Sequence, residues 1–155
     1  MVLWRISNHL SLAGVGALRT SGRWHTRGRR AVYCALTPSA ALLEILVHFE
    51  IDIQGLPVRY RLLRVEAPND VSVERISVVQ LPPDWPEKAD VTRAIGDAWL
   101  AKGRAPLMIV PSAIVPETFN VLLNPDHPDA RRIVIAKITD HAIDPRLLMI
   151  PGPAP

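Results

Sequence analysis

The sequence predicts one compact α+β domain. Its 155 residues are close to the commonest domain size, and no internal repeat or linker divides them. Apolar residues make up 48% and charged residues 21%, which favours a folded chain over a disordered one. Strand-like and helix-like segments follow one another without the regular rhythm of a doubly wound sheet. We expect the domain to cover residues 1–150 and the Pro-rich residues 151–155 to form a loose tail.

The first predicted helix comes directly after the first predicted strand. Residues 30–36 form a strand built on Val32 and Tyr33. Thr37 then supplies an N-cap and Pro38 suits the first helical turn, so we expect a helix over residues 38–49. Its apolar residues follow helical spacing and predict that it is largely buried; they are Leu42, Leu43, Ile45, Leu46, Val47 and Phe49.

The middle of the chain predicts further strands and a second helix. Residues 59–65 and parts of residues 71–81 have strand character, and a Pro-rich loop follows at residues 82–86. Asp90 is the predicted N-cap of the second helix. The apolar residues of that helix recur at i, i+4 and i+8; they are Val91, Ile95 and Trp99.

Two apolar segments near the C-terminus predict the last strands. Residues 107–110 are apolar and stop at Pro111, which is typical of a buried strand. Residues 131–138 are the other predicted strand, with Ile133 and Ile135 on one face.

The cysteine and histidine content and the lengths of the apolar runs exclude several classes of protein. A lone Cys34 rules out an internal disulfide framework and fits a reducing compartment. No apolar run approaches the roughly 20 residues of a membrane span. The five histidines lack the paired spacing of metal ligands; they are His9, His25, His48, His127 and His141. We therefore expect a cytoplasmic protein without a metal site or membrane contact.

Basic residues gather in one short segment although the net charge is only +3; they are Arg23, Arg27, Arg29 and Arg30. Such a cluster can meet a nucleic acid, an anionic nucleotide or an acidic partner. No DNA-reading helix or aromatic stacking motif accompanies it, which disfavours general nucleic-acid binding.

Glu44 is the most conspicuous candidate for chemistry. It lies in the middle of a helix whose neighbours are nearly all apolar, and a buried carboxylate is costly unless it is paired or used. The alternative is a structural ion pair or partial exposure, since His48 lies one turn away.

Two further candidates precede Glu44. Arg23 lies in a glycine-flanked basic turn, where an arginine can bind phosphate through two hydrogen bonds. The alternative is a solvated loop. Tyr33 can stack on a base or a nicotinamide ring, but a tyrosine in such a strand is more often part of the core.

Polar residues in the last third give weaker signals. Ser112 lacks the glycine-flanked elbow of a hydrolase nucleophile, which argues against a serine hydrolase. Asn120 and residues 124–128 are explained by Asx-type turns, and His127 is either functional or an ordinary surface histidine.

Taken in order, these segments resemble the RES family, which is named for arginine, glutamate and serine positions. The resemblance spans nearly the whole chain. The segments that carry it are LWRI at residues 3–6, GVGA at 14–17, GRWHTRG at 22–28, AVY at 31–33, PSAALLE at 38–44, TRAIGDAWL at 92–100, VPSA at 110–113 and NPDHP at 124–128.

The resemblance implies a fold related to ADP-ribosyltransferase toxins and a cytoplasmic toxin that depletes NAD. It also implies an Xre-type helix-turn-helix antitoxin as partner, with DNA met only through that antitoxin. The family's active-site positions fall on Arg23, Tyr33, Glu44 and Ser112. NAD is then the substrate, with no separate cofactor, and Arg27, Arg29 and Arg30 receive no role.

These residues suit cleavage of the nicotinamide–ribose bond by water or phosphate. Glu44 can stabilise the positive charge that develops on the ribose, while Arg23 binds the pyrophosphate. Tyr33 packs on the nicotinamide or its ribose, and Ser112 hydrogen-bonds the substrate. Transfer of ADP-ribose to a protein remains an alternative, as does a non-catalytic protein whose basic loop binds nucleic acid or a partner.

Overall fold

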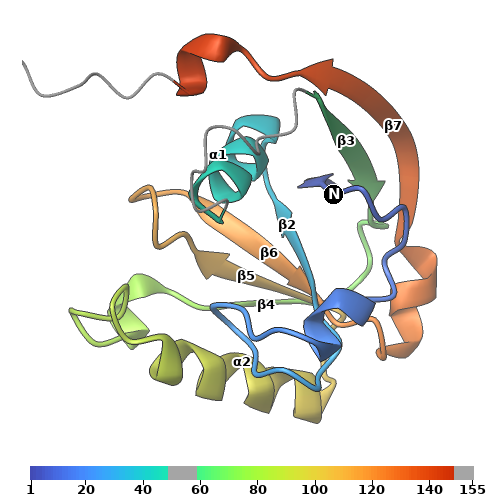
Figure 1. Ribbon diagram of the computed structural model, residues 1–155. Coiled ribbons are helices and arrows are strands. Elements are labelled where there is room, and N and C mark those ends of the chain that lie inside the picture. The colour runs from blue at the N-terminus through green and yellow to red at the C-terminus, as the bar shows by residue number, and fades with distance from the viewer. Residues whose placement is uncertain (49–58, 149–155) are drawn as a thin grey trace, which may run out of the picture.

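The computed structural model describes residues 1–48 and 59–148 and confirms the α+β fold (Figure 1). Seven strands of the described residues form one sheet in the order β4-β5-β6-β2-β1-β3-β7. The strands are β1 Val2–Ile6, β2 Val32–Ala35, β3 Arg59–Glu66, β4 Val73–Arg75, β5 Leu107–Pro111, β6 Phe119–Leu123 and β7 Val134–Ala142. The α-helices are α1 Pro38–His48 and α2 Ala89–Lys102, and short 3-10 helices lie between some of these elements.

The sheet consists of two halves that meet at β1 and β2. These two strands share a single paired position, Trp4 with Ala35, whereas β1 pairs with β3 along its whole length. Figure 1 shows β3 and β7 curving away from β5 and β6. Buried side chains of both halves nevertheless share one core cluster, including Leu3 and Leu63 from one half and Leu107 and Val121 from the other. The halves therefore enclose the main core between them.

A second core cluster lies between α2 and the opposite face of β5, β6 and β2. Trp99 of α2 packs there with Met108 and Leu122. Trp24 and Trp85, from the loops that precede β2 and α2, complete the cluster with ring centroids 6.1 Å apart. This cluster joins α2 to the loop that carries Arg23.

Helix α1 begins as predicted but is less buried than predicted. The Thr37 hydroxyl accepts a hydrogen bond from the Ala40 amide at 3.1 Å, which confirms the N-cap. Leu43 and Val47 are 41% and 57% exposed, because α1 covers the sheet with only part of its circumference. Leu42, Ile45 and Leu46 are only half-buried, so the prediction of a largely buried helix was wrong, while Phe49 lies outside the described residues.

The start of α2 also differs from the prediction. Its N-cap is Lys88, so the Asp90 prediction was wrong by two residues. Asp90 lies instead in the first turn, where a carboxylate is stabilised by the positive end of the helix dipole. The helix ends at Gly103, whose φ of 55° places it in the left-handed region that favours glycine.

Two of the predicted strands differ from the observed ones because short 3-10 helices occupy part of their residues. Residues 131 and 132 belong to a 3-10 helix, Pro128–Arg132, so the last strand begins later and extends to Ala142. Within residues 71–81 only β4 is a strand, and Val78–Gln80 is a 3-10 helix. The strands β1 and β6 were not predicted.

No helix in residues 1–48 and 59–148 is long and apolar enough to cross a membrane.

Candidate active site

Glu44 extends from α1 to the ends of β5 and β6. Its Oε1 accepts a hydrogen bond from Ser112 Oγ at 3.0 Å and another from Asn120 Nδ2 at 2.6 Å. Asn120 pairs with Val110 of β5, and Ser112 follows β5 directly, so one sheet edge supplies both donors. We call Glu44, Ser112 and Asn120 the carboxylate side of the site. Both donors are neutral groups, and together they orient the carboxylate.

The Ser112 hydroxyl is fully engaged within the protein. Its Oγ accepts from the amides of Ile114 at 3.1 Å and Val115 at 3.3 Å, and its proton is directed at Glu44. A hydroxyl that donates to a carboxylate in this way orients that carboxylate. A nucleophilic role would require Glu44 to take the serine proton.

A small cavity of about 80 Å³ lies beside the carboxylate side. Glu44 and Ser112 line it, and Ala40, Leu43 and Ile114 contribute apolar surface; the other lining residues are Thr37, Ser39, Val115 and Thr118. Apolar walls lower the local dielectric constant, which strengthens the field of Glu44 on any positive charge placed there.

Arg23 lies in a tight turn formed by residues 22–25. The Gly22 amide donates to the His25 carbonyl at 3.0 Å and lies 3.2 Å from His25 Nδ1. A Cβ at Gly22 would lie 2.5 Å from the Tyr33 hydroxyl, so only glycine fits. Arg23 itself donates from Nη1 to the Pro86 carbonyl at 2.5 Å.

The hydroxyl of Tyr33 joins this turn to β2. It accepts from the Trp24 amide at 2.9 Å and lies 2.9 Å from His25 Nδ1. His25 Nε2 lies 3.1 Å from the Thr20 carbonyl, which only accepts, so Nε2 carries the proton and Nδ1 accepts from Tyr33. Burial lowers the pKa of His25 and raises the pKa of Tyr33, so both are neutral near pH 7. We call residues 22–26 together with Tyr33 the arginine side.

The two sides of the site lie on the same face of the sheet. Tyr33 and Ala35 point to one face of β2, since alternate residues of a strand share a face, and Ala35 pairs with Asn120. A step of two residues along a strand covers about 7 Å, so Tyr33 lies about 7 Å along β2 from Ala35, the residue that pairs with Asn120. The fold therefore brings all four residues predicted from the sequence to one face: Glu44 and Ser112 in direct contact, and Arg23 and Tyr33 joined through the Trp24 backbone.

Comparison with known proteins decides the family. The family model of the RES domain matches residues 2–146. The chain belongs to the RES family. It is 46% identical over 147 residues to "Toxin Res" of Pseudomonas putida, covering 95% of this chain and 99% of that protein. It is 37% identical over 155 residues to "Prs ADP-ribosylating toxin" of a Sphingobium species, covering 94% and 95% respectively. The chain is thus a RES-domain toxin.

A solved structure supports the same fold. The RES chain superposes on a chain from the crystal structure of the M. tuberculosis MbcT–MbcA toxin–antitoxin complex with a TM-score of 0.75 and 20% sequence identity. The similarity covers 95% of this chain and 86% of that chain. At this identity the similarity establishes the fold alone.

Several polar residues of the RES domain that the sequence singled out have structural partners. His127 caps the 3-10 helix Pro128–Arg132, because its Nδ1 accepts from the Asp129 amide at 3.0 Å. Arg29 lies 3.4 Å from Asp97, and Arg30 lies 3.6 Å from Asp126. These contacts account for residues whose role the sequence left open.

Asn120 and His25 are contacts of the site that sequence reasoning missed. Asn120 had been explained as a turn residue, yet it lies in β6 among apolar neighbours, and its Oδ1 is buried without a hydrogen bond among the described residues. A polar residue inside an apolar strand was the available signal. His25 gave no signal, because its contact with Tyr33 depends on how the turn packs. Among residues 1–48 and 59–148, no cluster of three or more potential metal ligands exists.

Proposed function

We propose that this RES toxin binds NAD and breaks its nicotinamide–ribose bond, which depletes cellular NAD and arrests growth. The observation that carries the proposal is the Glu44 carboxylate, fixed by Ser112 and Asn120 beside a partly apolar cavity. The name of the Sphingobium relative, an ADP-ribosylating toxin, is consistent with chemistry at the same bond.

The chemistry requires a fixed negative charge and little else. As the carbon–nitrogen bond breaks, its electron pair goes to the nicotinamide ring nitrogen, and nicotinamide leaves as a neutral molecule. Positive charge develops on the ribose, and Glu44 stabilises it electrostatically. Water then adds to the ribose carbon and releases a proton, giving ADP-ribose, or phosphate adds and gives ADP-ribose-1″-phosphate. No strong general acid is needed.

The arginine side fits substrate binding. Arg23 is the proposed pyrophosphate ligand, since a guanidinium binds phosphate oxygens through parallel hydrogen bonds. The Tyr33 hydroxyl is held by Trp24 and His25, so the ring face or edge is the part of Tyr33 offered to the nicotinamide ribose. Ser112 acts through Glu44 in this proposal, rather than as a separate substrate contact.

The test is NAD consumption by the wild-type protein and Glu44→Gln. This substitution removes the charge and almost no volume, so we expect a loss of activity of at least about a hundredfold, comparable to the loss of one electrostatic stabiliser in other enzymes. Unchanged thermal unfolding would show that the variant is folded. Near-wild-type NAD cleavage by a folded Glu44→Gln protein would contradict the catalytic role of Glu44.

The acceptor is decided by product analysis of the same reaction. Mass spectrometry after incubation with NAD, with and without phosphate and cell lysate, distinguishes free ADP-ribose, ADP-ribose-1″-phosphate and modified protein. Protein modification is the second candidate, because a relative 37% identical to this chain is named as ADP-ribosylating. A protein that consumes no NAD but shows salt-sensitive nucleic-acid binding would instead be a binding protein.

We also propose a cognate Xre-type helix-turn-helix antitoxin that inhibits by covering the site in the cytoplasm, with DNA contacted only by the antitoxin. The solved relative in fold was crystallised as a toxin–antitoxin complex, which supports a protein partner. A competition assay tests occlusion: NAD binding should be lost in the purified complex. Binding of NAD to the intact complex at the affinity of the free toxin would contradict it.

A further inference from the structure

The first turns of α2 hold the loop that carries Arg23. The Thr92 hydroxyl donates to the Arg23 carbonyl at 2.6 Å, and Arg93 Nε donates to the Gly22 carbonyl at 2.9 Å. One turn further, Asp97 accepts from the Thr26 amide at 3.0 Å and from its hydroxyl. One helix therefore binds Gly22, Arg23 and Thr26 of the loop, and Arg93 binds the residue that directly precedes Arg23.

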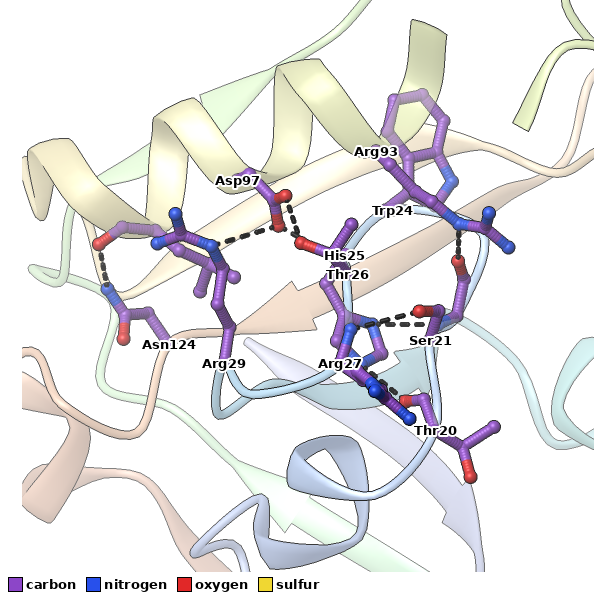
Figure 2. Close-up of polar contacts among 12 residues, drawn as sticks. Thr20, Ser21, Trp24, His25, Thr26, Arg27, Arg29, Arg93, Asp97 and Asn124 are labelled. Atoms are coloured by element: carbon purple, nitrogen blue, oxygen red, sulfur yellow. Dashed lines mark hydrogen bonds and ion pairs between the residues drawn. The ribbon is translucent and has the colours of Figure 1, made fainter. Parts of the chain in front are cut away.

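The charge of Arg93 is oriented but not neutralised. Asp97 lies four residues further along α2, where an ion pair with Arg93 is ordinarily formed. Instead Asp97 binds Thr26 and Arg29, and Arg93 binds a carbonyl (Figure 2). A carbonyl fixes a guanidinium in place but leaves its full positive charge. Among the described residues, Arg93 has no carboxylate within ion-pair distance.

Arg23 is held in the same way. The only hydrogen bond that its guanidinium makes within the described residues is to the Pro86 carbonyl, and it forms no ion pair there. The contrast with the neighbouring arginines is clear, because Arg29 pairs with Asp97 and Arg30 with Asp126. A larger hollow of about 260 Å³ beside Arg29 and Arg30 thus has balanced charge, whereas the pair Arg23 and Arg93 does not.

The free edge of Arg93 suits a phosphate. Nε is occupied by Gly22, but the two terminal nitrogens make no hydrogen bond within the described residues and point away from the loop and from Asp97 in Figure 2. That edge can donate two parallel hydrogen bonds to phosphate oxygens. Both arginines also act on the same group: burial raises the pKa of Tyr33, and the positive charges of Arg93 and Arg23 oppose that rise. The two cations therefore lie on the same part of the site.

We propose that Arg93 is a second substrate-binding residue that, together with Arg23, binds the pyrophosphate of NAD. The inference rests on the proposed function, because it assigns a new residue to the same site. Arg93 is bound to the residue that precedes Arg23, and neither arginine has an ion pair among the described residues, so a ligand with two negative charges can pair with both. The pyrophosphate of a dinucleotide has this charge on adjacent phosphorus centres.

The test measures ADP-ribose binding by calorimetry in the Glu44→Gln background, which also permits NAD titration without turnover. We expect Arg93→Lys to weaken the affinity about tenfold, the factor that corresponds to about 1.4 kcal/mol. Lysine retains the charge but cannot present two parallel donors. The matched control is Arg29→Lys, which retains its ion pair with Asp97 and should change the affinity by less than about twofold.

A double-mutant comparison separates binding from positioning. If Arg93 acted only by holding Gly22, and thus Arg23, its substitution would have no further effect once Arg23 is alanine. Direct binding instead predicts that Arg93→Lys weakens ADP-ribose further in the Arg23→Ala protein. No further loss in that background would overturn the inference.

A second variant guards against misfolding. Arg93→Gln retains an amide donor for Gly22 but has no charge, and it should also weaken ADP-ribose while the unfolding midpoint stays near that of the parent. Wild-type affinity of either folded variant would overturn the inference and leave the proposed function intact. If the Glu44→Gln protein bound neither NAD nor ADP-ribose and the wild type consumed no NAD, the proposed function would fail and the inference with it.

Discussion

The arginine side and the carboxylate side of this site are held in very different ways. On the arginine side, three residues of α2 bind one loop: Thr92 binds Arg23, Arg93 binds Gly22 and Asp97 binds Thr26. Gly96 also lies against the Trp24 backbone. On the carboxylate side, side-chain hydrogen bonds from Ser112 and Asn120 contact Glu44, which belongs to a helix with an exposed outer face.

Because the two sides are held differently, substitutions on them should have different effects on stability and on catalysis. Changes where α2 meets the loop disturb packed backbone, so they should affect folding as well as binding. Changes around Glu44 remove side-chain contacts without moving packed backbone, so they should affect catalysis with little loss of stability.

The largest effect is expected at Gly96. An added Cβ would lie 1.7 Å from the Trp24 carbonyl oxygen, which belongs to backbone and cannot move alone. We expect Gly96→Ala to lower the free energy of unfolding by about 3 kcal/mol, as overpacking a well-packed site does. Denaturant unfolding measures this. Gly16→Ala is the control, because nothing lies within 4 Å of its added Cβ, and equal stability of the two variants would refute the tight contact.

Asn120 should show the opposite pattern. Asn120→Ala removes the hydrogen bond of 2.6 Å to Glu44, so we expect kcat for NAD cleavage to fall about tenfold to a hundredfold, as for loss of roughly 1.5–3 kcal/mol from a hydrogen bond to a charged group. Stability should change little, since the unsatisfied Oδ1 is removed as well. Asn124→Ala is the matched control: it removes a buried asparagine that binds Leu100 and Asp126, and kcat should stay unchanged. A large stability loss with intact kcat in Asn120→Ala would reverse our assignment.

Tyr33→Phe tests the arginine side by removing a single hydroxyl group. The change leaves the Trp24 amide without its acceptor and removes the Tyr33 hydrogen bond to His25 Nδ1, so we expect a loss of about 1–3 kcal/mol in unfolding free energy. Thermal or denaturant unfolding provides the measurement. Tyr60→Phe serves for comparison, because the ring of Tyr60 stacks on His141 in the outer half of the sheet, far from the loop. A Tyr33→Phe protein as stable as Tyr60→Phe would mean that the hydroxyl does not hold the turn.

Arg23→Lys should affect binding more than turnover. Lysine retains the charge but not the planar two-point contact, so we expect KM for NAD to rise about tenfold, which corresponds to about 1.4 kcal/mol. Steady-state kinetics separates KM from kcat. Equal KM values for the two proteins would show that Arg23 does not bind the pyrophosphate in this way.

Much of the fold was predictable because local signals and packing agree. The Thr37-Pro38 pair and the spacing of apolar residues identified α1, and the apolar run before Pro111 identified β5. The strand β6 was missed because Asn120 interrupts its apolar residues, which leaves a run of only three before a polar turn. The β1 strand was missed because Arg5 interrupts it, and the structure shows that this arginine donates from Nη1 to the Tyr33 carbonyl at 3.0 Å. In both strands a polar residue serves a tertiary contact that local spacing does not reveal.

The four candidate residues came from the family resemblance together with their chemistry, whereas their supports did not. Asn120 touches Glu44 across 76 positions of the chain, and Arg93 touches Gly22 across 71. Contacts at such separations depend on sheet order and helix placement, which spacing along the chain does not encode.

The smallest expected effect is a pH dependence from His25. Burial lowers its pKa below the ordinary value of 6.5, so the unfolded chain takes up a proton at a higher pH than the folded one. The stability from keeping this ring neutral is therefore complete above pH 6.5 and decreases as the pH falls from there toward the lower folded pKa. Unfolding midpoints between pH 7 and about pH 5, above the range where most carboxylates titrate, provide the measurement. His25→Gln carries no titratable group, so its midpoint should change less across this interval even though the variant is less stable throughout. An identical slope in the two proteins would mean that His25 has the same pKa in the folded and unfolded chains, which would contradict the lowering of its pKa by burial.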